Sequence, residues 1–309
     1  MGQTLAVVIG SNSPIGRCLV SRLSQIRVRV LSEPSFSDAA ALTASLRGVD
    51  VVFHLTSSAT SDGRPASDLA HVNHVLMESA YLAEVGCIVH SSPATAMGFT
   101  DRADLVRDES SLSRRRMSSS DRLWHDAEEA TLEFGNWTGL SVVAVRHAMP
   151  ITPLSETGSL ADNPIRSAMS GVLPRVFDGG LTVAHVQDLA DGHVLAWRRG
   201  RSGESYILGG QRVEIPSYVR LITDLCPVNR ADQAVRSKSA RWWPRWKFPV
   251  VGSFQDQSPL TWDDLEDQYA WFTCQKGIKE LGYHDRSVEE SILEVTERMS
   301  GNLHRRHAA

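Results

Sequence analysis

The stretch Leu5–Gly16, with the sequence LAVVIGSNSPIG, restricts the possible folds of this chain more than any other. Leu5–Ile9 is an unbroken apolar run, which is typical of a parallel strand covered on both faces. Gly10 ends this run, Gly16 follows, and apolar residues then recur at helical spacing. The stretch therefore predicts a buried strand, a tight turn and the start of a helix.

A glycine-containing turn between a strand and a helix can hold a phosphate, because bare backbone amides and the helix dipole both face the anion. The middle glycine of the usual patterns is missing, since Ser13 stands in its place. The alternative is a strand, a turn and a helix without any ligand. We favour a dinucleotide-binding turn, because the stretch opens a series of βα units. Its predicted contacts are Gly10, Asn12, Ser13, Pro14, Ile15 and Gly16.

Strands and helices alternate along residues 1–150, which predicts a doubly wound parallel sheet. After the first unit we expect strands at 28–31, 51–55, 87–90 and 140–145, and helices at 39–46, 69–84 and 122–134. The alternation weakens after Pro150. There we expect strands at 181–186 and 205–208, helices at 164–172, 188–197, 215–225, 265–272 and 287–299, and a frayed tail at 301–309.

Composition argues against several classes of function. The formal net charge of −4 gives no sign of a nucleic-acid partner or an anionic membrane surface. No apolar run approaches the roughly 20 residues of a membrane span. The N-terminus leads directly into the first strand, so we expect no signal peptide and a cytoplasmic location. The four cysteines are scattered without metal-ligand spacing, and we expect no metal site.

Several segments, in the right order, together resemble the extended short-chain dehydrogenase/reductase superfamily. The resemblance is to its NAD-dependent epimerase/dehydratase and dihydroflavonol-reductase-like branch, and it covers nearly the whole chain. Besides the glycine turn, the segments that carry it are LRGVDVVFHLTS (46–57), IVHSSPA (88–94), DAEEATLEF (126–134), LTVAHVQDLADGHVLAWRRGRSGESYILGG (181–210) and KGIKELGYHDRSVEESI (276–292).

This resemblance implies a Rossmann-like α/β fold with a small C-terminal α/β substrate-binding subdomain. The dinucleotide-binding domain would span residues 1–150. A substrate-binding region would span 151–300, with 181–210 returning to the Rossmann core. It also implies a homodimer formed through the helices at 69–84 and 122–134. As substrate we expect a small hydrophobic molecule.

The implied cofactor is NAD or NADP. Leu55, Thr56 and Ser57 would run along it. Glu33 near the end of the second strand would accept hydrogen bonds from ribose hydroxyls and repel a 2′-phosphate, which favours NAD, although an exposed glutamate is the alternative. The link after Leu31 is short, so we expect the family's third strand to be shortened or absent.

The family's catalytic set of Ser/Thr, Tyr and Lys is incomplete in this chain. The serine position falls on Ser92, whereas the tyrosine position falls on Ser120 and the lysine position on Trp124. No lysine precedes Lys238, and Tyr81 is the only tyrosine before Tyr206. A serine hydroxyl does not titrate near neutrality and an indole carries no charge. Ordinary carbonyl reduction is therefore expected to be impaired.

Histidines are the natural substitutes as acid or base. We consider His90 and His147 as site residues, with burial in the core as the alternative for His90, while Asp121 and Tyr81 are further possibilities. His125 is expected on the helix surface and His185 in a structural role. The stretch 242–246, WWPRW, would line a pocket or lid, or pack a subdomain.

Three functions remain open at this point. The first is a redox-neutral enzyme, of cyclase, isomerase or lyase type, acting on a hydrophobic biosynthetic intermediate. The second is an NAD(P)-dependent reductase or epimerase with a substitute acid/base residue. The third is a non-catalytic protein that senses a dinucleotide or serves as a scaffold.

Overall fold

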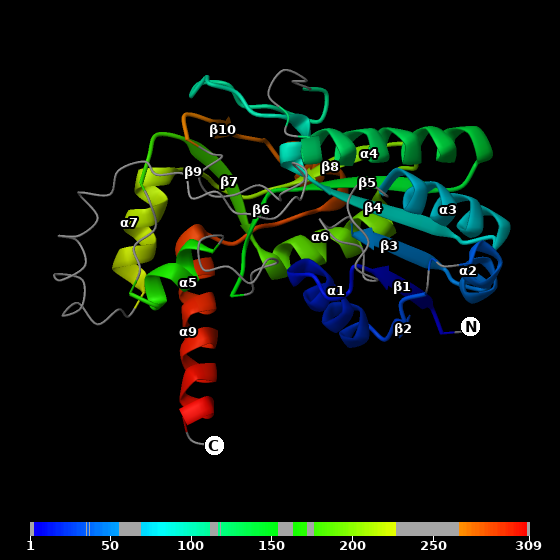
Figure 1. Ribbon diagram of the computed structural model, residues 1–309, viewed down its shortest axis with the longest axis horizontal. Coiled ribbons are helices and arrows are strands. Elements are labelled where there is room, and N and C mark those ends of the chain that lie inside the picture. Colours follow the sequence, from blue (N-terminus) through cyan, green and yellow to red (C-terminus); the bar gives the residue numbers. More distant parts are fainter. Residues whose placement is uncertain are drawn as a thin grey trace, which may run out of the picture.

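The computed structural model shown in Figure 1 describes most of the chain. The described residues are 3–34, 36, 38–55, 69–111, 117, 119–153, 163–171, 176–226 and 266–307, with the backbone alone for 119, 120 and 301–307. The predicted stretch 242–246 lies outside these residues, as do Thr56 and Ser57. No helix among the described residues is both long enough and apolar enough to cross a membrane.

Six parallel strands form the central sheet, in the order β2-β1-β3-β4-β5-β8. Their bounds are Leu5–Ile9 (β1), Arg29–Leu31 (β2), Val51–Leu55 (β3), Cys87–Pro93 (β4), Val142–His147 (β5) and Ser205–Leu208 (β8). Strands β1, β3, β4 and β5 begin with apolar runs, as expected where helices cover both faces of a parallel sheet. The predicted doubly wound sheet is confirmed.

Helices cover the two faces of this sheet in separate groups (Figure 1). On one face lie α1 and α6, and on the other lie α2, α3 and α4. Successive residues of a strand point to opposite faces of the sheet. Val8 therefore packs against the first group of helices and Val7 against the second. The bounds are Pro14–Gln25 (α1), Ala39–Leu46 (α2), Leu69–Leu82 (α3), Ser119–Thr138 (α4) and Val186–Arg199 (α6).

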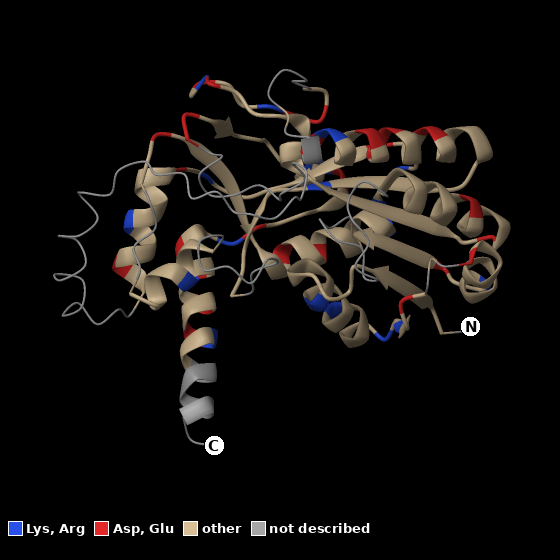
Figure 2. Cartoon of the chain, in the orientation of Figure 1, with Lys and Arg blue, Asp and Glu red and all other residues tan. Residues whose placement is uncertain are grey.

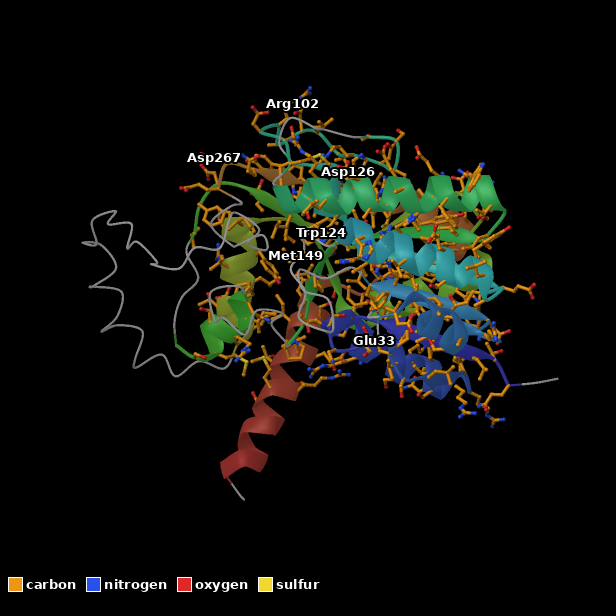
Figure 3. The ribbon with its side chains drawn as sticks, turned by 45° about the vertical axis from the view of Figure 1, so that its right-hand side comes forward. Glu33, Arg102, Trp124, Asp126, Met149 and Asp267 are labelled. Carbon is orange, nitrogen blue, oxygen red and sulfur yellow. The ribbon has the colours of Figure 1, made fainter. Side chains whose placement is uncertain are left out.

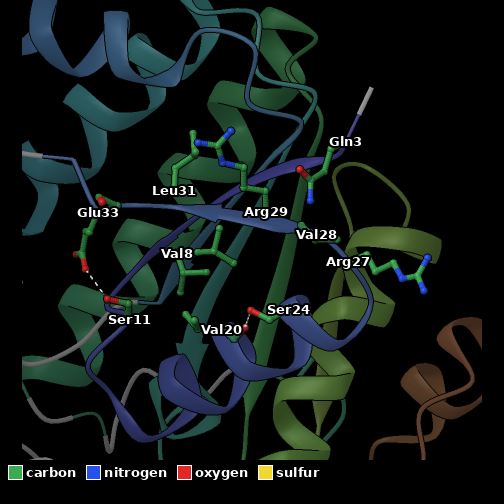
Figure 4. A pocket seen from close by; sticks show the side chains of 12 residues that line it. Gln3, Val8, Ser11, Val20, Ser24, Arg27, Val28, Arg29, Leu31 and Glu33 are labelled. Atoms are coloured by element: carbon green, nitrogen blue, oxygen red, sulfur yellow. Dashed lines mark hydrogen bonds between the residues drawn. The ribbon is translucent and has the colours of Figure 1, made fainter. Parts of the chain in front are cut away.

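Strand β2 lies at the edge of the sheet. The chain passes from β2 to α2 on the opposite face through residues 32–38, and in the described part of the chain β1 is the one strand that pairs with β2. This edge agrees with the expected loss of a third strand. A pocket of about 790 Å³ runs along β2 beside α1, with Ser11 and Glu33 at one end and Arg27 at the other (Figure 4).

A smaller sheet lies beyond the C-terminal end of β5. Its order is β10-β7-β6, and β9 pairs antiparallel with β7. The strands are Met149–Ile151 (β6), Gly180–His185 (β7), Arg212–Glu214 (β9) and Tyr269–Ala270 (β10). This sheet shares a second hydrophobic core with the helices Pro164–Met169 (α5), Ile215–Leu225 (α7) and Val288–His307 (α9). The described single turns are Ala94–Met97 (η2, 3-10) and Gly277–Leu281 (η6, π-helix).

The predicted helix at 265–272 is wrong. This segment contains β10, which pairs with β7, and Tyr269 exchanges backbone hydrogen bonds with Thr100. The amide of Arg107 donates to the carbonyl of Trp271 in the same way. Aromatic residues at alternating positions suit such pairing, but two residues of regular strand are too few to show a period in the sequence. The short strands β6 and β9 are missed for the same reason.

Two glycines bring α1 against the end of β1. A Cβ added at Gly16 would lie 2.2 Å from the carbonyl oxygen of Gly10. Gly10 has φ of +80°, and a Cβ there would lie 2.6 Å from the carbonyl oxygen of Leu55 on β3. Both positions therefore exclude a side chain because backbone atoms fill the space, which explains the glycines without invoking a ligand.

We predict that Gly16→Ala destabilises the protein by about 3 kcal/mol or more, since neighbouring backbone must move to admit the methyl group. Gly48→Ala is the matched control. Gly48 has φ of +75° with no atom within 4 Å of an added Cβ, so the backbone conformation alone costs about 1 kcal/mol. Urea unfolding measures both; equal losses in the two variants would contradict this account of the turn.

Candidate functional site

The candidate site lies at the carboxyl-terminal edge of the parallel sheet, where doubly wound proteins bind ligands. The glycine turn follows β1, Glu33 follows β2, and Leu55 ends β3. Pro93 and His147 are opposite each other at the ends of β4 and β5. The predicted residues therefore gather at one edge of the fold, although their side chains differ in direction and burial.

Ser13 caps helix α1. Its Oγ accepts a hydrogen bond from the Gly16 amide at 3.0 Å, and its own amide donates to the Gly10 carbonyl at 3.0 Å. Pro14 occupies the first helical turn, where the lack of an amide hydrogen costs nothing. The Ile15 amide, at the second helical position, has no intrahelical acceptor. The turn is thus a regular capped helix start whose positive end suits an anion.

Glu33 is bound to this same turn. Its Oε1 accepts from the Gly10 amide at 3.0 Å. Its Oε2 accepts from Ser11 Oγ at 3.0 Å, the contact drawn as a dashed line in Figure 4. Each carboxylate oxygen retains a second lone pair for a further donor. Glu33 and Ser11 also line the pocket along β2. The donors and acceptors present therefore fit the ribose and diphosphate of an adenine dinucleotide, with the carboxylate unfavourable to a 2′-phosphate.

Ser92 lies inside β4, one residue before the end of the strand, and is fully buried. Its Oγ donates to Oε2 of Glu128 on α4 at 2.5 Å. Oε1 of Glu128 accepts from Nε and Nη2 of Arg146 on β5, both at 2.7 Å. Arg146 Nη1 donates to the carbonyl of Glu109 at 2.8 Å. Ser92, Glu128 and Arg146 form a buried cluster that joins β4, β5 and α4.

This cluster limits what Ser92 does in the observed arrangement. Because its proton is donated to Glu128, the hydroxyl can accept a hydrogen bond but has no proton left to offer a substrate oxygen. The pairing of Glu128 with Arg146 was not predicted from the sequence. Two features of the sequence could have suggested this pair. Glu128 is a carboxylate on the inner side of a helix, and Arg146 is an arginine near the end of a buried strand.

Trp124 is buried under α4, where it packs with Leu69, Ala96 and Ala127 (Figure 3). The indole therefore sits among apolar side chains at the position that the resemblance gives to a lysine. Ser120, at the tyrosine position, lies in the first turn of α4, and its side chain is outside the described residues.

The two histidine candidates lie in different surroundings. His90 is fully buried on the same face of β4 as Ser92, with its ring centroid 5.1 Å from that of His54. Neither ring nitrogen of His90 has a hydrogen-bond partner in the described part of the chain. His147 is half-buried at the end of β5, and its Nδ1 lies 3.1 Å from the Ala148 carbonyl oxygen. With Nδ1 as that donor, Nε2 of His147 is an acceptor.

Burial sets the protonation of these imidazoles. It lowers the pKa of His90 and of His147 to about 4, so both are neutral at pH 7. Burial also holds the pKa of His54 well below 6.5 and lowers that of His193 to about 4. His185 caps α6 by accepting from the Gln187 amide, and burial lowers its pKa to about 4 as well. The structural role expected for His185 is confirmed, whereas His125 is buried rather than on the surface as expected.

Comparison of structures identifies the fold. The chain is similar to UDP-glucose 4-epimerase from Thermotoga maritima, with a TM-score of 0.71 and 17% identity over 97% of this chain and 100% of that chain. It is also similar to DesIV, a dTDP-glucose 4,6-dehydratase from Streptomyces venezuelae solved with NAD bound, with a TM-score of 0.74 and 19% identity over 97% of this chain and 98% of that one. The predicted Rossmann-like fold of NAD-dependent epimerases and dehydratases is confirmed.

Sequence comparison gives a weaker match. A protein from Synechocystis sp. named "Putative dihydroflavonol 4-reductase" is 24% identical over 165 residues. The match covers 51% of this chain and 48% of that protein, so the chain spans about half of the length of this relative. No protein-family model matches the sequence.

We predict that Glu128→Gln destabilises the protein by about 3 kcal/mol, because Arg146 loses the charge that compensates its burial. Ser92→Ala is expected to cost about 1–3 kcal/mol, since one buried carboxylate oxygen loses its donor. Chemical unfolding of both single variants and the double variant forms a thermodynamic cycle. Simple additivity of the two losses would show that Ser92 and Glu128 do not act as one unit.

We also predict that stability falls as the pH drops from about 6.5 toward 4. The unfolded chain takes up protons near 6.5, whereas His54, His90, His147, His185 and His193 resist protonation in the fold. Between about pH 6.5 and 4, each of these histidines adds up to about 1.4 kcal/mol per pH unit to the slope of the free energy of unfolding against pH. Above about pH 6.5 they add nothing to this slope.

His90→Leu is expected to remove the contribution of one histidine to this slope. The free energy of unfolding at pH 7 is expected to stay unchanged or to rise, because the change removes two buried nitrogens that lack hydrogen-bond partners. His74→Leu, which removes an imidazole at an exposed position, is the matched control. Urea unfolding at several pH values provides the measurement, and equal slopes in wild type and His90→Leu would refute the assignment.

Proposed function

We propose that this protein is an enzyme built on the extended short-chain dehydrogenase/reductase fold that catalyses a redox-neutral step on an apolar biosynthetic intermediate. The step would be a cyclisation, isomerisation, dehydration or elimination. The observation that carries this proposal is Trp124, which fills the place of a catalytic lysine and is packed among Leu69, Ala96 and Ala127.

Carbonyl reduction needs a proton donor of suitable pKa beside the hydride acceptor. In the enzymes that this chain resembles, a lysine cation lowers the pKa of a tyrosine for that purpose. Trp124 is uncharged and has one N–H donor, and Ser120 has no group that titrates near neutrality. Trp124 and Ser120 therefore favour a reaction that depends on the shape of the site and on polarisation of the substrate, rather than a reduction.

The chain's own residues suit such a step in three ways. Gly10–Gly16 and Glu33 would bind the diphosphate and the ribose of NAD, which when bound can take up and return a hydride. The neutral His147 would accept a hydrogen bond or a proton at Nε2. The buried pair of Glu128 and Arg146 holds Ser92 and α4 in position. Holding a reactive conformer in place can by itself lower a barrier substantially.

Two other functions have specific support. His147, half-buried at the end of β5, could replace the missing tyrosine in an NAD(P)-dependent reductase or epimerase, and the similar proteins are named as a reductase, an epimerase and a dehydratase. The well-formed contacts of Glu33 to Gly10 and Ser11 would also serve a protein that binds a dinucleotide without converting anything.

Mass spectrometry distinguishes the proposed redox-neutral step from a reduction and from dinucleotide binding without conversion. The purified protein is incubated with NAD(H), NADP(H) and small-molecule extracts of the source organism, with heat-inactivated protein as the control. A product of unchanged mass, or one lacking the elements of water, is expected while nicotinamide absorbance stays constant. A product that gains two hydrogens with loss of NAD(P)H would contradict the proposal in favour of the reductase. Dinucleotide binding without any product would support the sensor.

We predict that Glu33→Gln weakens NAD binding about tenfold, or about 1.4 kcal/mol, because a charged acceptor for the ribose hydroxyls becomes neutral. Glutamine can keep both contacts, by accepting from the Gly10 amide and donating to Ser11 Oγ, so the turn is expected to remain intact. Glu214→Gln, on the second sheet, is the control. Isothermal titration with NAD and NADP measures both; unchanged NAD affinity would remove Glu33 from the site.

A further inference from the structure

Three potential metal ligands lie close together on α4, two of them on the side of the helix that faces away from Trp124. They are His125, Asp126 and Glu129, and one ligand atom from each lies within 4.8 Å of the others. Trp124 and Asp126 are two residues apart, so they differ by about 200° around the helix. Figure 3 shows Trp124 below α4, toward the sheet, and Asp126 on the helix itself. The group is therefore separate from the candidate site described above.

His125 provides an observation independent of the two carboxylates. Its side chain is 7% exposed, although its helical position predicted a surface location. Its Nε2 is buried and makes no hydrogen bond in the described part of the chain. The same atom lies 3.3 Å from Oε1 of Glu129. Nε2 of His125 is thus directed at the carboxylates. A buried nitrogen that makes no hydrogen bond costs free energy, and coordination of a metal ion would offset that cost.

The spacing of the three residues brings their ligand atoms together. His125 and Glu129 are four residues apart and lie about 40° apart around the helix, with Asp126 about 100° from His125. Asp126 and Glu129 are exposed, so their side chains can rotate toward a bound ion without disturbing the core. Figure 2 shows acidic residues along α4, and the sequence of this helix contains one lysine or arginine, Arg122. The local charge therefore favours a cation.

We propose that His125, Asp126 and Glu129 form a site for a divalent transition-metal ion, with Zn²⁺ as the ion that best fits. An imidazole and two carboxylates match the nitrogen and oxygen ligands that Zn²⁺ and Co²⁺ accept, whereas Ca²⁺ and Mg²⁺ prefer oxygen ligands throughout. Three protein ligands leave a coordination position for water. A bound ion would tie together one turn of α4, the helix that also carries Trp124 and Glu128.

A second pair on the neighbouring helix offers a matched control. His74 and Glu78 on α3 have the same spacing, with Nε2 and Oε1 3.2 Å apart, but both side chains are more than half exposed. Within the described residues, no third histidine, cysteine or acidic group joins them to complete a set. If an exposed His–Glu pair were sufficient, His74→Ala would reduce metal binding as much as changes on α4.

Titration of the full-length protein without an affinity tag tests the site. Zn²⁺ is expected to bind with one equivalent and to raise the melting temperature, and Co²⁺ is expected to give the visible absorption of a site with nitrogen and oxygen ligands. Asp126→Asn combined with Glu129→Gln is expected to weaken Zn²⁺ binding at least tenfold, and His125→Ala likewise. The double variant changes exposed positions, so the test stands even if His125→Ala fails to fold.

Three control variants are expected to bind as wild type. They are His74→Ala, Glu133→Gln one turn further along α4, and His304→Ala with His307→Ala near the C-terminus. The absence of Zn²⁺ binding in the wild type would overturn the proposal. Binding that persists in the Asp126→Asn, Glu129→Gln variant, or that is lost in one of the three controls, would also overturn it.

Discussion

The buried ion pair between Glu128 and Arg146 is the interaction on which the candidate site depends. It joins α4 to β5, and through Ser92 it also joins α4 to β4. Arg146 extends the connection to the Glu109 carbonyl, and the Glu109 side chain accepts from the Ile207 amide on β8. A buried pair of this kind need not add net stability, but losing one partner is costly because the other charge remains buried. The position of α4 over the sheet is thus tightly determined.

Helix α4 presents different chemistry on its two sides. The inner side carries Trp124 among apolar neighbours, with Glu128 one turn later in the buried cluster. The outer side carries Asp126 and Glu129, with the buried imidazole of His125 directed at them. At the position that the resemblance gives to a lysine, the inner side therefore carries an uncharged indole. The redox-neutral function proposed above rests on this indole together with a glycine turn that fits a dinucleotide.

Much of the fold could be predicted because it follows from local patterns. The helices 39–46 and 215–225 and the strands 51–55 and 205–208 occur with the predicted bounds. The short link after Leu31 predicted a shortened or absent third strand, in agreement with the position of β2 at the edge of the described sheet. The failures include the segments at 149–151, 212–214 and 269–270, which form strands through pairing with distant residues. A strand of two or three residues is too short to show the alternation of apolar and polar positions by which strands are predicted.

The sequence by itself determined the Rossmann-like architecture, the glycine turn and the absence of a tyrosine–lysine pair, because each of these depends on residue type or spacing within a short stretch. The tertiary structure decided which side chains meet. Ser92 pairs with a carboxylate 36 residues away, Glu33 binds a turn 23 residues before it, and His125 is buried where helical periodicity alone placed it outside. Contacts of this kind depend on the packing of helices against a sheet, and burial then sets the charge state of each group, as the lowered pKa of His90 and of His147 shows.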